Sequence, residues 1–206
     1  MTKEIIYIGD PMCSWCWGFS PVINAIRHDF NHEAPLSIIL GGLHAYDDFP
    51  MSNDYKTNIR HHWQDVNTAT GAIFDYRFFD RDKFILDTEP ACRAVVTIRQ
   101  IKPDSVLLFY ESISRSFYSE NKDTTVLKTF KLLVEELDID FKEFDKQFNS
   151  EHTKVETKND FQFSKKIGVT GFPTLLVKED EKLALLTAGY KPYKTLRPVI
   201  ENWLSS

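Results

Sequence analysis

Two cysteines stand three positions apart in the stretch Asp10-Pro11-Met12-Cys13-Ser14-Trp15-Cys16-Trp17-Gly18-Phe19. Residues 5–8, shortly before it, read Ile-Ile-Tyr-Ile, a continuous apolar run that predicts a short strand buried on both faces. From residue 19 to residue 30, apolar side chains recur every three or four positions, which predicts a helix that begins near Cys13. Pro21 lies inside this helix and is expected to kink it. The cysteine pair is therefore expected where a buried strand turns into a helix.

This position favours redox chemistry for the two thiols. Thiols three residues apart on a first helical turn can close a disulfide without large backbone movement. The unpaired N–H groups and the positive dipole end of a helix also stabilise a thiolate, and such motifs lower a thiol pKa from about 8.5 to roughly 3.5–7.5. We therefore expect Cys13 to be the catalytic nucleophile with a lowered pKa, and Cys16, one turn deeper, to be the catalytic resolving thiol.

The remaining strand patterns lie toward the two ends of the chain. Residues 36–40 form a second apolar run, so strand, helix and strand follow within about forty residues, a length typical of a right-handed parallel crossover. Residues 174–177 and 183–188 flank a charged turn and predict a hairpin. A terminal helix is expected after Pro192. These elements predict an α/β fold with a small mixed sheet.

The middle of the chain predicts helices and no strand. Asp140, followed by Glu143, resembles a capping box for one short helix. Apolar stripes with helical spacing recur at residues 91–101, 106–117 and 126–137. No linker rich in Pro, Gly or Ser sets this block apart, so we expect it to pack on the rest of the fold. The expected domains are residues 1–45 and 151–206 for the host domain and residues 46–150 for an inserted helical domain.

The composition of the 206 residues excludes several classes of function. The net charge is −5 and the basic and acidic residues are interspersed, so no nucleic-acid partner is expected. No apolar run approaches the roughly 20 residues that span a bilayer, and the N-terminal stretch does not resemble a secretory signal, so no membrane partner is expected. The three cysteines are too few for a disulfide framework and favour a cytoplasmic location.

The other candidate ligands and nucleophiles are expected to be structural. A closed zinc site needs four ligands, and the chain has no second close pair at ligand spacing, so no metal site is expected. A zinc or Cu(I) binding protein is kept as a third alternative. Cys92 lies on an apolar helix face and is expected to be a packed core thiol. His44, His61 and His62 are expected to be structural or solvated.

With these residues in hand, the chain resembles the thioredoxin superfamily, and within it the DsbA-like oxidoreductases of the cytosolic FrnE-like branch. The resemblance rests on the cysteine stretch, on Pro21, and on the later motifs Asp87-Thr88-Glu89-Pro90-Ala91 and Val169-Thr170-Gly171-Phe172-Pro173-Thr174. It covers nearly the whole chain. It implies a thioredoxin-like fold, βαβ…ββα, with a large helical insertion. It also implies a thiol–disulfide oxidoreductase that oxidises, reduces or isomerises protein disulfides.

The resemblance further implies roles for residues outside the cysteine pair. Pro173 is expected to have a cis peptide bond beside the cysteines, and the backbone of Phe172 is expected to pair with the substrate. Trp15 and Phe172 are expected to border the substrate-binding surface. Many relatives have a buried acid six positions before the first cysteine, where this chain has Tyr7. The proton acceptor for the second thiol therefore stays open, with Asp10 or water as substitutes.

No cofactor is implied beyond a redox-active Cys13–Cys16 disulfide, with glutathione as a candidate co-substrate. The implied partners are protein or peptide thiols and disulfides, together with glutathione or a thioredoxin-type reductant. A glutathione-dependent transferase or isomerase of the kappa or 2-hydroxychromene-2-carboxylate type is the alternative function. Those relatives share the inserted architecture but have serine at the nucleophilic position.

An aromatic segment at residues 71–84 leaves two interpretations open. Charged residues alternate in it with five aromatic ones, Phe74, Tyr76, Phe78, Phe79 and Phe84. This alternation suggests partial exposure. The rings either anchor the helical block onto the sheet, or some of them border an apolar groove that takes extended polypeptide beside Cys13.

Overall fold

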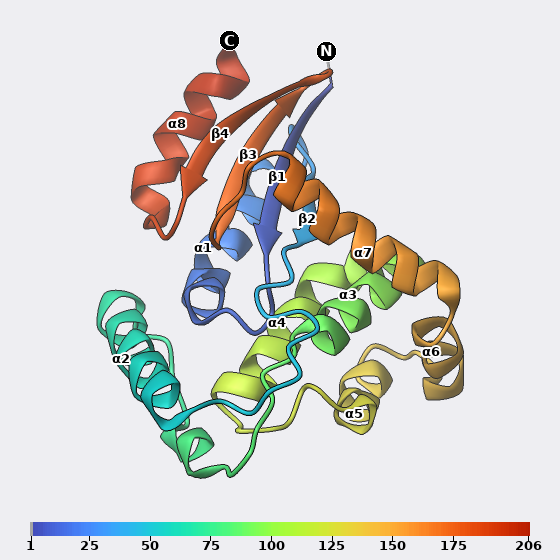
Figure 1. The fold of residues 1–206 in the computed structure, drawn as a ribbon. Helices are drawn as coiled ribbons and strands as arrows, with labels where there is room; N and C mark the ends of the chain where they lie inside the picture. The colour runs from blue at the N-terminus through green and yellow to red at the C-terminus, as the bar shows by residue number, and fades with distance from the viewer. Residues whose placement is uncertain (1) are drawn as a thin grey trace.

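The computed structural model describes residues 2–206, which form one four-stranded sheet surrounded by helices (Figure 1). The strands are β1 (Lys3–Gly9), β2 (Leu36–Leu40), β3 (Thr174–Glu179) and β4 (Lys182–Ala188). Their order across the sheet is β2-β1-β3-β4, in which β1 is parallel to β2 and the other two neighbouring pairs are antiparallel. The predicted mixed sheet and its C-terminal hairpin are therefore confirmed.

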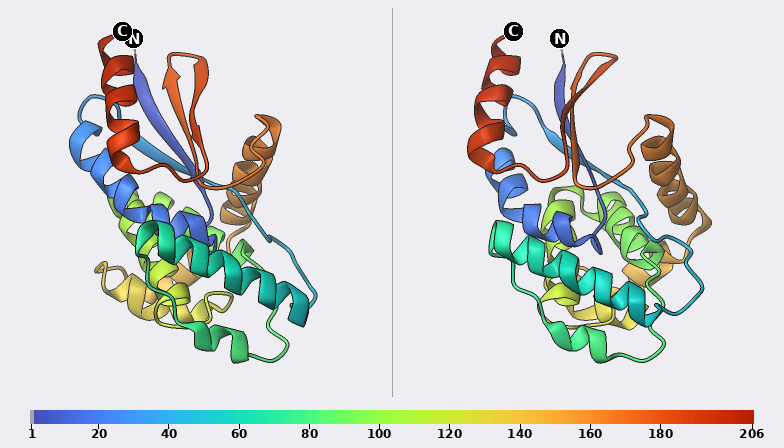
Figure 2. Two further views of the ribbon diagram at one scale, coloured as in Figure 1. Left: turned by 90° about the vertical axis from the view of Figure 1, so that its left-hand side faces the viewer. Right: turned by 60° about the vertical axis from the view of Figure 1, so that its left-hand side comes forward.

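The helices lie on both faces of the sheet and beyond one end of it. Helices α1 (Ser14–Phe30) and α8 (Tyr193–Ser205) lie on one face, and α7 (Glu151–Lys166) lies on the other (Figure 2). The other α-helices gather beyond the end at which β1 leads into α1: α2 (Asn53–Thr70), α3 (Glu89–Ile101), α4 (Val106–Tyr118), α5 (Phe130–Glu135) and α6 (Phe141–Phe148). The thioredoxin-like α/β fold with its helical insertion is confirmed, whereas the domain boundaries near residues 45 and 150 stay a prediction.

Side chains of β1 reach opposite faces of the sheet in alternation. Ile5 and Tyr7 belong to the large apolar cluster that includes α1 and the inserted helices. Ile6 and Ile8 belong to a smaller cluster on the opposite face, together with Leu176 of β3. All of these side chains are buried, because β1 lies between two strands and is covered on both faces. The loop that carries the cysteines therefore leaves a strand that is held on every side.

Side-chain hydrogen bonds set several helix ends. The Asp140 carboxylate accepts hydrogen bonds from two N–H groups of the first turn of α6, as its capping pattern predicted. The continuous helix expected at residues 126–137 is wrong, because a short 3₁₀ helix, η3 (Leu127–Thr129), precedes α5. The Asp123 carboxylate binds the N–H and the hydroxyl of Thr125. This local turn competes with a regular helix start.

The aromatic segment at residues 71–84 is packed in the core around Trp63 of α2. It contains a short 3₁₀ helix, η1 (Tyr76–Asp80). The rings with centroids within 5.1 Å of Trp63 are Phe74, Phe78, Phe79 and Tyr118. The expected partial exposure is wrong for the four phenylalanines of the segment, all of which are buried. Their rings hold the segment between α2 and α4, within the helical block, so anchoring onto the sheet stays a prediction.

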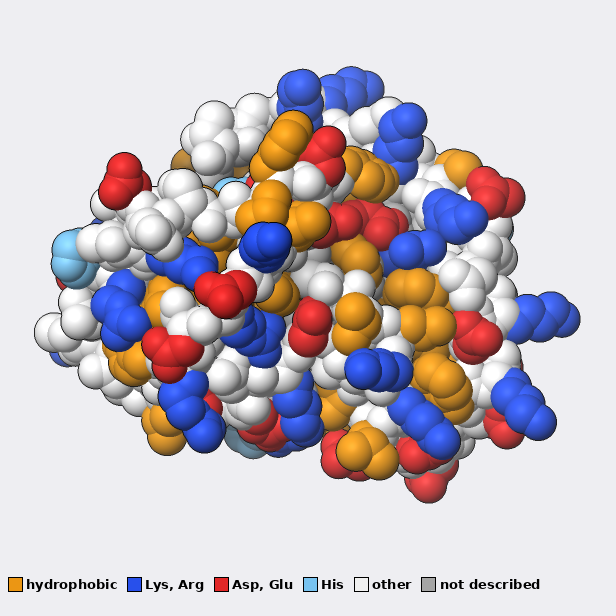
Figure 3. Space-filling model, turned by 60° about the horizontal axis from the view of Figure 1, so that its bottom comes forward, with side chains coloured by type: hydrophobic (Ala, Val, Ile, Leu, Met, Phe, Trp, Pro, Cys, Tyr) orange, Lys and Arg blue, Asp and Glu red, His pale blue; other side chains and the backbone are white. Residues whose placement is uncertain are grey.

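Two observations describe the surface. None of the helices formed by residues 2–206 is long and apolar enough to cross a bilayer. On the face shown in Figure 3, basic and acidic side chains are interspersed with one another and with apolar ones. This mixed distribution is the one that the charge pattern of the sequence predicted.

Candidate active site

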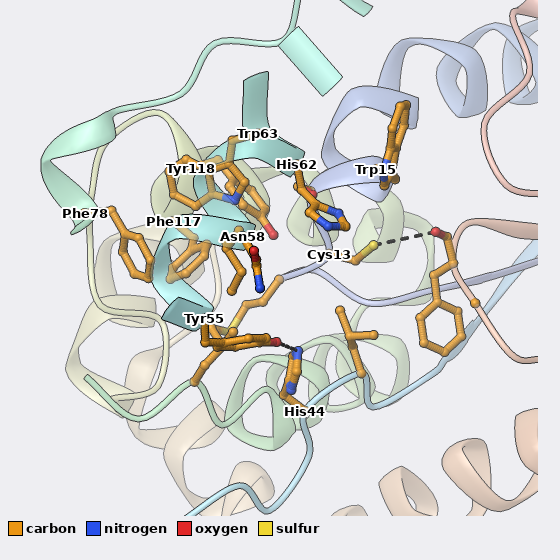
Figure 4. Close-up of a pocket in the computed structure, with 17 residues that line it drawn as sticks. Cys13, Trp15, His44, Tyr55, Asn58, His62, Trp63, Phe78, Phe117 and Tyr118 are labelled. Carbon is orange, nitrogen blue, oxygen red and sulfur yellow. Dashed lines mark hydrogen bonds between the residues drawn. The ribbon is translucent and has the colours of Figure 1, made fainter. Parts of the chain in front are cut away.

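Cys13 and Cys16 lie at the start of α1, beside the loop that precedes β3. Cys13 has extended backbone (φ −97°, ψ 121°) directly before the helix, and its Sγ atom lies 3.7 Å from the carbonyl oxygen of Phe172 (Figure 4). Cys16 lies within the first turn and is fully buried, whereas Cys13 keeps 6% of its surface exposed. The structure therefore brings both cysteines and Phe172 together, with Cys13 on the outer side of the pair.

The loop before Cys13 is held by the buried carboxylate of Asp10. One carboxylate oxygen accepts a hydrogen bond from the Met12 N–H at 2.8 Å. The other accepts from the Leu43 N–H at 2.7 Å, the Thr88 hydroxyl at 2.8 Å and the Cys92 thiol at 3.4 Å. Burial nevertheless raises the pKa of Asp10, because desolvation of the carboxylate outweighs these hydrogen bonds. Asp10 thus ties the cysteine loop to the loop after β2 and to α3.

The position of Phe172 depends on Gly41, the residue that follows β2. An added Cβ at Gly41 would lie 2.0 Å from a ring carbon of Phe172, so only glycine leaves room for this ring. Gly41 also extends the pairing of β1 with β2, since its N–H donates to the Gly9 carbonyl at 2.8 Å. The peptide bond that follows Phe172, between Phe172 and Pro173, is cis. The loop before β3 is therefore packed directly against the end of β2.

Each thiol of the pair affects the ionisation of the other. The hydrogen bond with Cys16, together with burial, raises the pKa of Cys13 well above its ordinary value. Burial also raises the pKa of Cys16, but hydrogen bonds from Cys13 and Tyr7 outweigh it and bring this pKa below its ordinary value. The expected lowered pKa of Cys13 is wrong, because the hydrogen bond with the Cys16 thiol and the burial of Cys13 outweigh the backbone N–H of Cys16, which alone would lower this pKa.

An apolar cavity of about 330 Å³ opens beside Cys13 (Figure 4). Its walls come from the start of α1, from α2, from the loop after β2 and from the loop before β3. Trp15 and Phe172, both predicted to border a substrate site, line this cavity, and Cys16 does not. Phe78 also lines it, although that side chain is buried, whereas Phe79 does not.

Several polar side chains of the cavity wall were not predicted from the sequence. His44, expected to be structural or solvated, lies on the wall with its Nε2 atom 2.7 Å from the Tyr55 hydroxyl, while Asp47 lies 3.0 Å from its Nδ1 atom. Asn58 and His62 of α2 also face the cavity. Their spacing of four places them on one helix face. Nothing in the sequence shows that this face of α2 meets Cys13.

Comparison with known proteins identifies the family. A family model described as thioredoxin matches residues 103–197. The whole chain is similar to the crystal structure of a candidate protein disulfide isomerase from Nitrosomonas europaea, with 37% identity and a TM-score of 0.92 over 100% of this chain and 98% of that chain. This chain belongs to the thioredoxin superfamily, and its fold is DsbA-like.

Other proteins to which the chain is similar are more distant. The cytosolic disulfide reductase DsbM from Pseudomonas aeruginosa is 22% identical, with a TM-score of 0.83 over 98% of both chains. The ClpXP adapter protein SpxH from Halalkalibacterium halodurans is 20% identical over 209 residues, which cover 98% of this chain and 67% of that relative. At such identities, the likeness to DsbM shows the fold of this DsbA-like protein and not its activity.

The remaining ligand candidates of this DsbA-like protein lie apart from one another. Within residues 2–206, no group of three Cys, His, Asp or Glu side chains is placed to hold a metal ion. Cys92 is fully buried on α3, as its apolar helix face predicted. Burial raises the pKa of its thiol well above the ordinary value, which keeps the sulfur neutral.

Proposed function

We propose that this DsbA-like protein is a thiol–disulfide oxidoreductase in which Cys13 exchanges with the substrate and Cys16 resolves. One observation carries the proposal: of the two buried cysteines, only Cys13 lines the cavity, and Cys16 is enclosed behind it. A substrate sulfur that enters the cavity therefore meets Cys13 first. The 37% identity to a candidate protein disulfide isomerase supports the same chemistry.

The first step uses the hydrogen bond between the two thiols. The pKa of Cys16 is lowered and that of Cys13 is raised, so Cys16 is the thiol of the reduced pair that ionises first. As Cys13 attacks a substrate disulfide, its proton passes to Cys16. A bond forms between the Cys13 sulfur and one substrate sulfur, and the other substrate sulfur leaves as a thiolate.

The second step closes the disulfide of the protein. Cys16 loses its proton, its thiolate attacks the Cys13 sulfur, and the bound substrate sulfur leaves with the electron pair of the broken bond. In total, two electrons pass from the protein dithiol to the substrate disulfide. The reverse sequence oxidises a substrate dithiol.

We propose reduction as the direction of this reaction and the cytoplasm as its compartment. The likeness to a protein described as a cytosolic disulfide reductase, whose structure is also known with glutathione, supports both. Two glutathione thiols would restore the protein dithiol and yield one glutathione disulfide. A thioredoxin-type reductant would fill the same role.

We further propose protein or peptide disulfides as substrates. The Phe172 carbonyl faces the Cys13 sulfur, and Pro173, the next residue, has no N–H. An extended substrate chain that pairs with this loop therefore finds the Phe172 carbonyl as a hydrogen-bond acceptor beside the reactive sulfur. The apolar cavity wall, which includes Trp15, adds contacts that do not require one particular side chain. Trp15, Phe172 and Pro173 are thus the proposed substrate-binding residues.

Trapped intermediates test the two cysteine roles. After treatment with glutathione disulfide, Cys16→Ser should accumulate one glutathione on Cys13, whereas Cys13→Ser should accumulate none because its remaining pair thiol is enclosed. Cys92→Ser serves as the matched control and should behave as the wild type. Mass spectrometry of tryptic peptides locates the adduct. An adduct on Cys16 and none on Cys13 would refute the assignment.

A redox titration tests the direction and the alternative function. Trp15 and Trp17 flank Cys16 in sequence, so their fluorescence should report oxidation of the pair in glutathione buffers. A reductase that glutathione restores requires a reduction potential above that of cytosolic glutathione and below that of its substrate disulfide. A transferase or isomerase of the glutathione-dependent type would instead keep its activity in Cys16→Ser, where no internal disulfide can form.

A further inference from the structure

Two tyrosine hydroxyls are buried next to Cys16, outside the lining of the cavity. Tyr7 of β1 and Tyr110 of α4 are both buried, and their hydroxyl oxygens lie 3.1 Å apart. Both hydroxyls also lower the pKa of the Cys16 thiol through hydrogen bonding. A continuous chain of polar atoms thus leads from Cys16 into the interface between β1 and α4.

The backbone leaves space for this hydroxyl pair at Gly9. An added Cβ at Gly9 would lie 2.7 Å from the Tyr7 hydroxyl oxygen and 2.8 Å from that of Tyr110. Gly9 lies in β1 and does not have the positive φ that favours glycine, so the backbone conformation does not require this residue. Glycine is required at this position because a side chain would occupy the space of the two hydroxyl groups.

A small hollow connects the pair to the surface. It has a volume of about 10 Å³, close to the space that one water molecule needs. Tyr7 and Tyr110 line it together with the exposed Asn24 and the half-buried Glu111, whose side chains are hydrogen bonded at 2.8 Å. No residue lines both this hollow and the cavity beside Cys13. The hollow is therefore a separate connection between the site and the solvent.

The other acidic candidate near the cysteines is fully engaged elsewhere. The Asp10 carboxylate accepts hydrogen bonds from the Met12 and Leu43 N–H groups and from the side chains of Thr88 and Cys92. These donors occupy both of its oxygens. Asp10 thus supports the loop, and the hydroxyl pair is left as the polar connection from Cys16 to solvent.

We propose that Tyr7 and Tyr110 form the route by which Cys16 releases its proton to solvent before it attacks Cys13. The inference rests on the proposed dithiol exchange and concerns its second step. The Cys16 proton passes to the Tyr7 oxygen, Tyr7 passes its own proton to Tyr110, and Tyr110 passes its own to water in the hollow. Each tyrosine gains and loses one proton, and the Cys16 sulfur keeps the electron pair that forms the new bond.

The tyrosines act in this route as neutral relays and not as bases. Burial raises the pKa of both hydroxyls well above the ordinary value, so neither ionises near neutral pH. As donors, they also stabilise the Cys16 thiolate once the proton has left. The titratable groups that act on this cluster come from β1, the cysteine loop and α4: Tyr7, Asp10, Cys13, Tyr110 and Tyr118.

The two releases of thionitrobenzoate from Ellman's reagent separate the two steps of exchange. Reduced protein releases the first as Cys13 attacks and the second as Cys16 closes the disulfide. Tyr7→Phe and Tyr110→Phe should keep the full amplitude of the first release. Both should slow the second by about tenfold at pH 7, the loss expected for one hydrogen bond to a charged sulfur. The pH midpoint of the second release should also move upward.

Two further variants control for a merely structural effect. Tyr193→Phe removes the same hydroxyl on α8, where it bonds Asp29 at the far end of α1, and should leave both releases unchanged. Gly9→Ala fills the space of the hydroxyl pair with both tyrosines intact and should reproduce the slow second release. It also serves as the test if Tyr7→Phe does not fold.

The outcomes distinguish this inference from the proposed function. A second release with the wild-type rate and pH midpoint in folded Tyr110→Phe and Gly9→Ala would overturn the route. A slow second release in Asp10→Asn, with normal release in the tyrosine variants, would assign the role to the carboxylate instead. Absence of the first release from the wild-type protein would overturn the dithiol exchange itself.

Discussion

The Sγ atom of Cys13 lies 3.7 Å from the carbonyl oxygen of Phe172, although the two residues are 159 positions apart in the chain. The Phe172 ring lies against Gly41, so the position of this carbonyl depends on contact between the loop before β3 and the end of β2. The strands bring these loops together, since β1 pairs with both β2 and β3. The site is therefore sensitive to small changes at Gly41.

Gly41→Ala should slow disulfide exchange without touching either cysteine. The new methyl group displaces the Phe172 ring, and a shift of about 1 Å in a site can cost up to about a hundredfold in rate. Overpacking should also lower the free energy of unfolding by about 1–3 kcal/mol. Stopped-flow exchange and urea unfolding measure the two effects. In Gly41→Ala/Phe172→Ala the clash is gone, so the stability costs should be less than additive, and additive costs would contradict this explanation.

The elements nearest to the cysteines were predictable because their signals are local. The buried run at residues 5–8, the helical spacing after Cys13 and the two apolar stretches of the hairpin each lie within a short window of sequence. Strand and helix periodicities are properties of such windows. The same holds for Asp140, whose carboxylate caps α6 within its own turn.

The surroundings of the cysteines were not predictable because they depend on contacts distant in sequence. Thr88 precedes α3 directly, but its side chain makes no cap hydrogen bond and donates instead to Asp10, 78 positions away. The lowered pKa expected for Cys13 considered only its helix and omitted the hydrogen bond with the Cys16 thiol and the burial of Cys13. The burial of the aromatic segment depends on Trp63, which lies outside it.

Ile59→Glu should weaken exchange with protein disulfides more than exchange with glutathione disulfide. Ile59 is a half-buried apolar residue of the cavity wall, and contact with a buried side chain of this size is worth about 1.5–3 kcal/mol. The turnover of insulin should therefore fall by about tenfold or more. Ile73→Glu is the matched control, because Ile73 is 70% exposed and does not line the cavity. Equal losses for both substrates would show that the cavity does not select polypeptides.

Cys92→Ala should keep the redox activity of the wild type. The Cys92 thiol is fully buried and neutral, and it donates a hydrogen bond to Asp10. Removal of this small group should lower the free energy of unfolding by about 1 kcal/mol. Cys92→Ser keeps a donor for Asp10 and separates loss of packing from loss of the hydrogen bond. A large loss of insulin reduction in folded Cys92→Ala would place the thiol in the reaction.

Asp10 should give the folded protein a specific pH dependence. Burial raises its pKa above the ordinary value of about 3.9. At any pH between the ordinary pKa and the raised pKa, the folded state therefore holds a proton that the unfolded state has released. Stability that depends on such a group is present at low pH and is lost as the pH rises through this window. Above the raised pKa, both states are ionised and the contribution becomes constant.

Asp10→Asn removes this titration and should change the free energy of unfolding in a pH-dependent way. An amide cannot accept from all four donors, so the variant should be less stable by about 1–3 kcal/mol. The difference should be largest near pH 4 and should shrink as the pH rises, because only the wild type loses stability in that window. Thr88→Val removes one donor that lowers the pKa of Asp10 and should extend the window to higher pH. Urea unfolding between pH 4 and pH 8 measures both variants, and a difference that grows with pH would mean that the hydrogen bonds to Asp10 outweigh its burial.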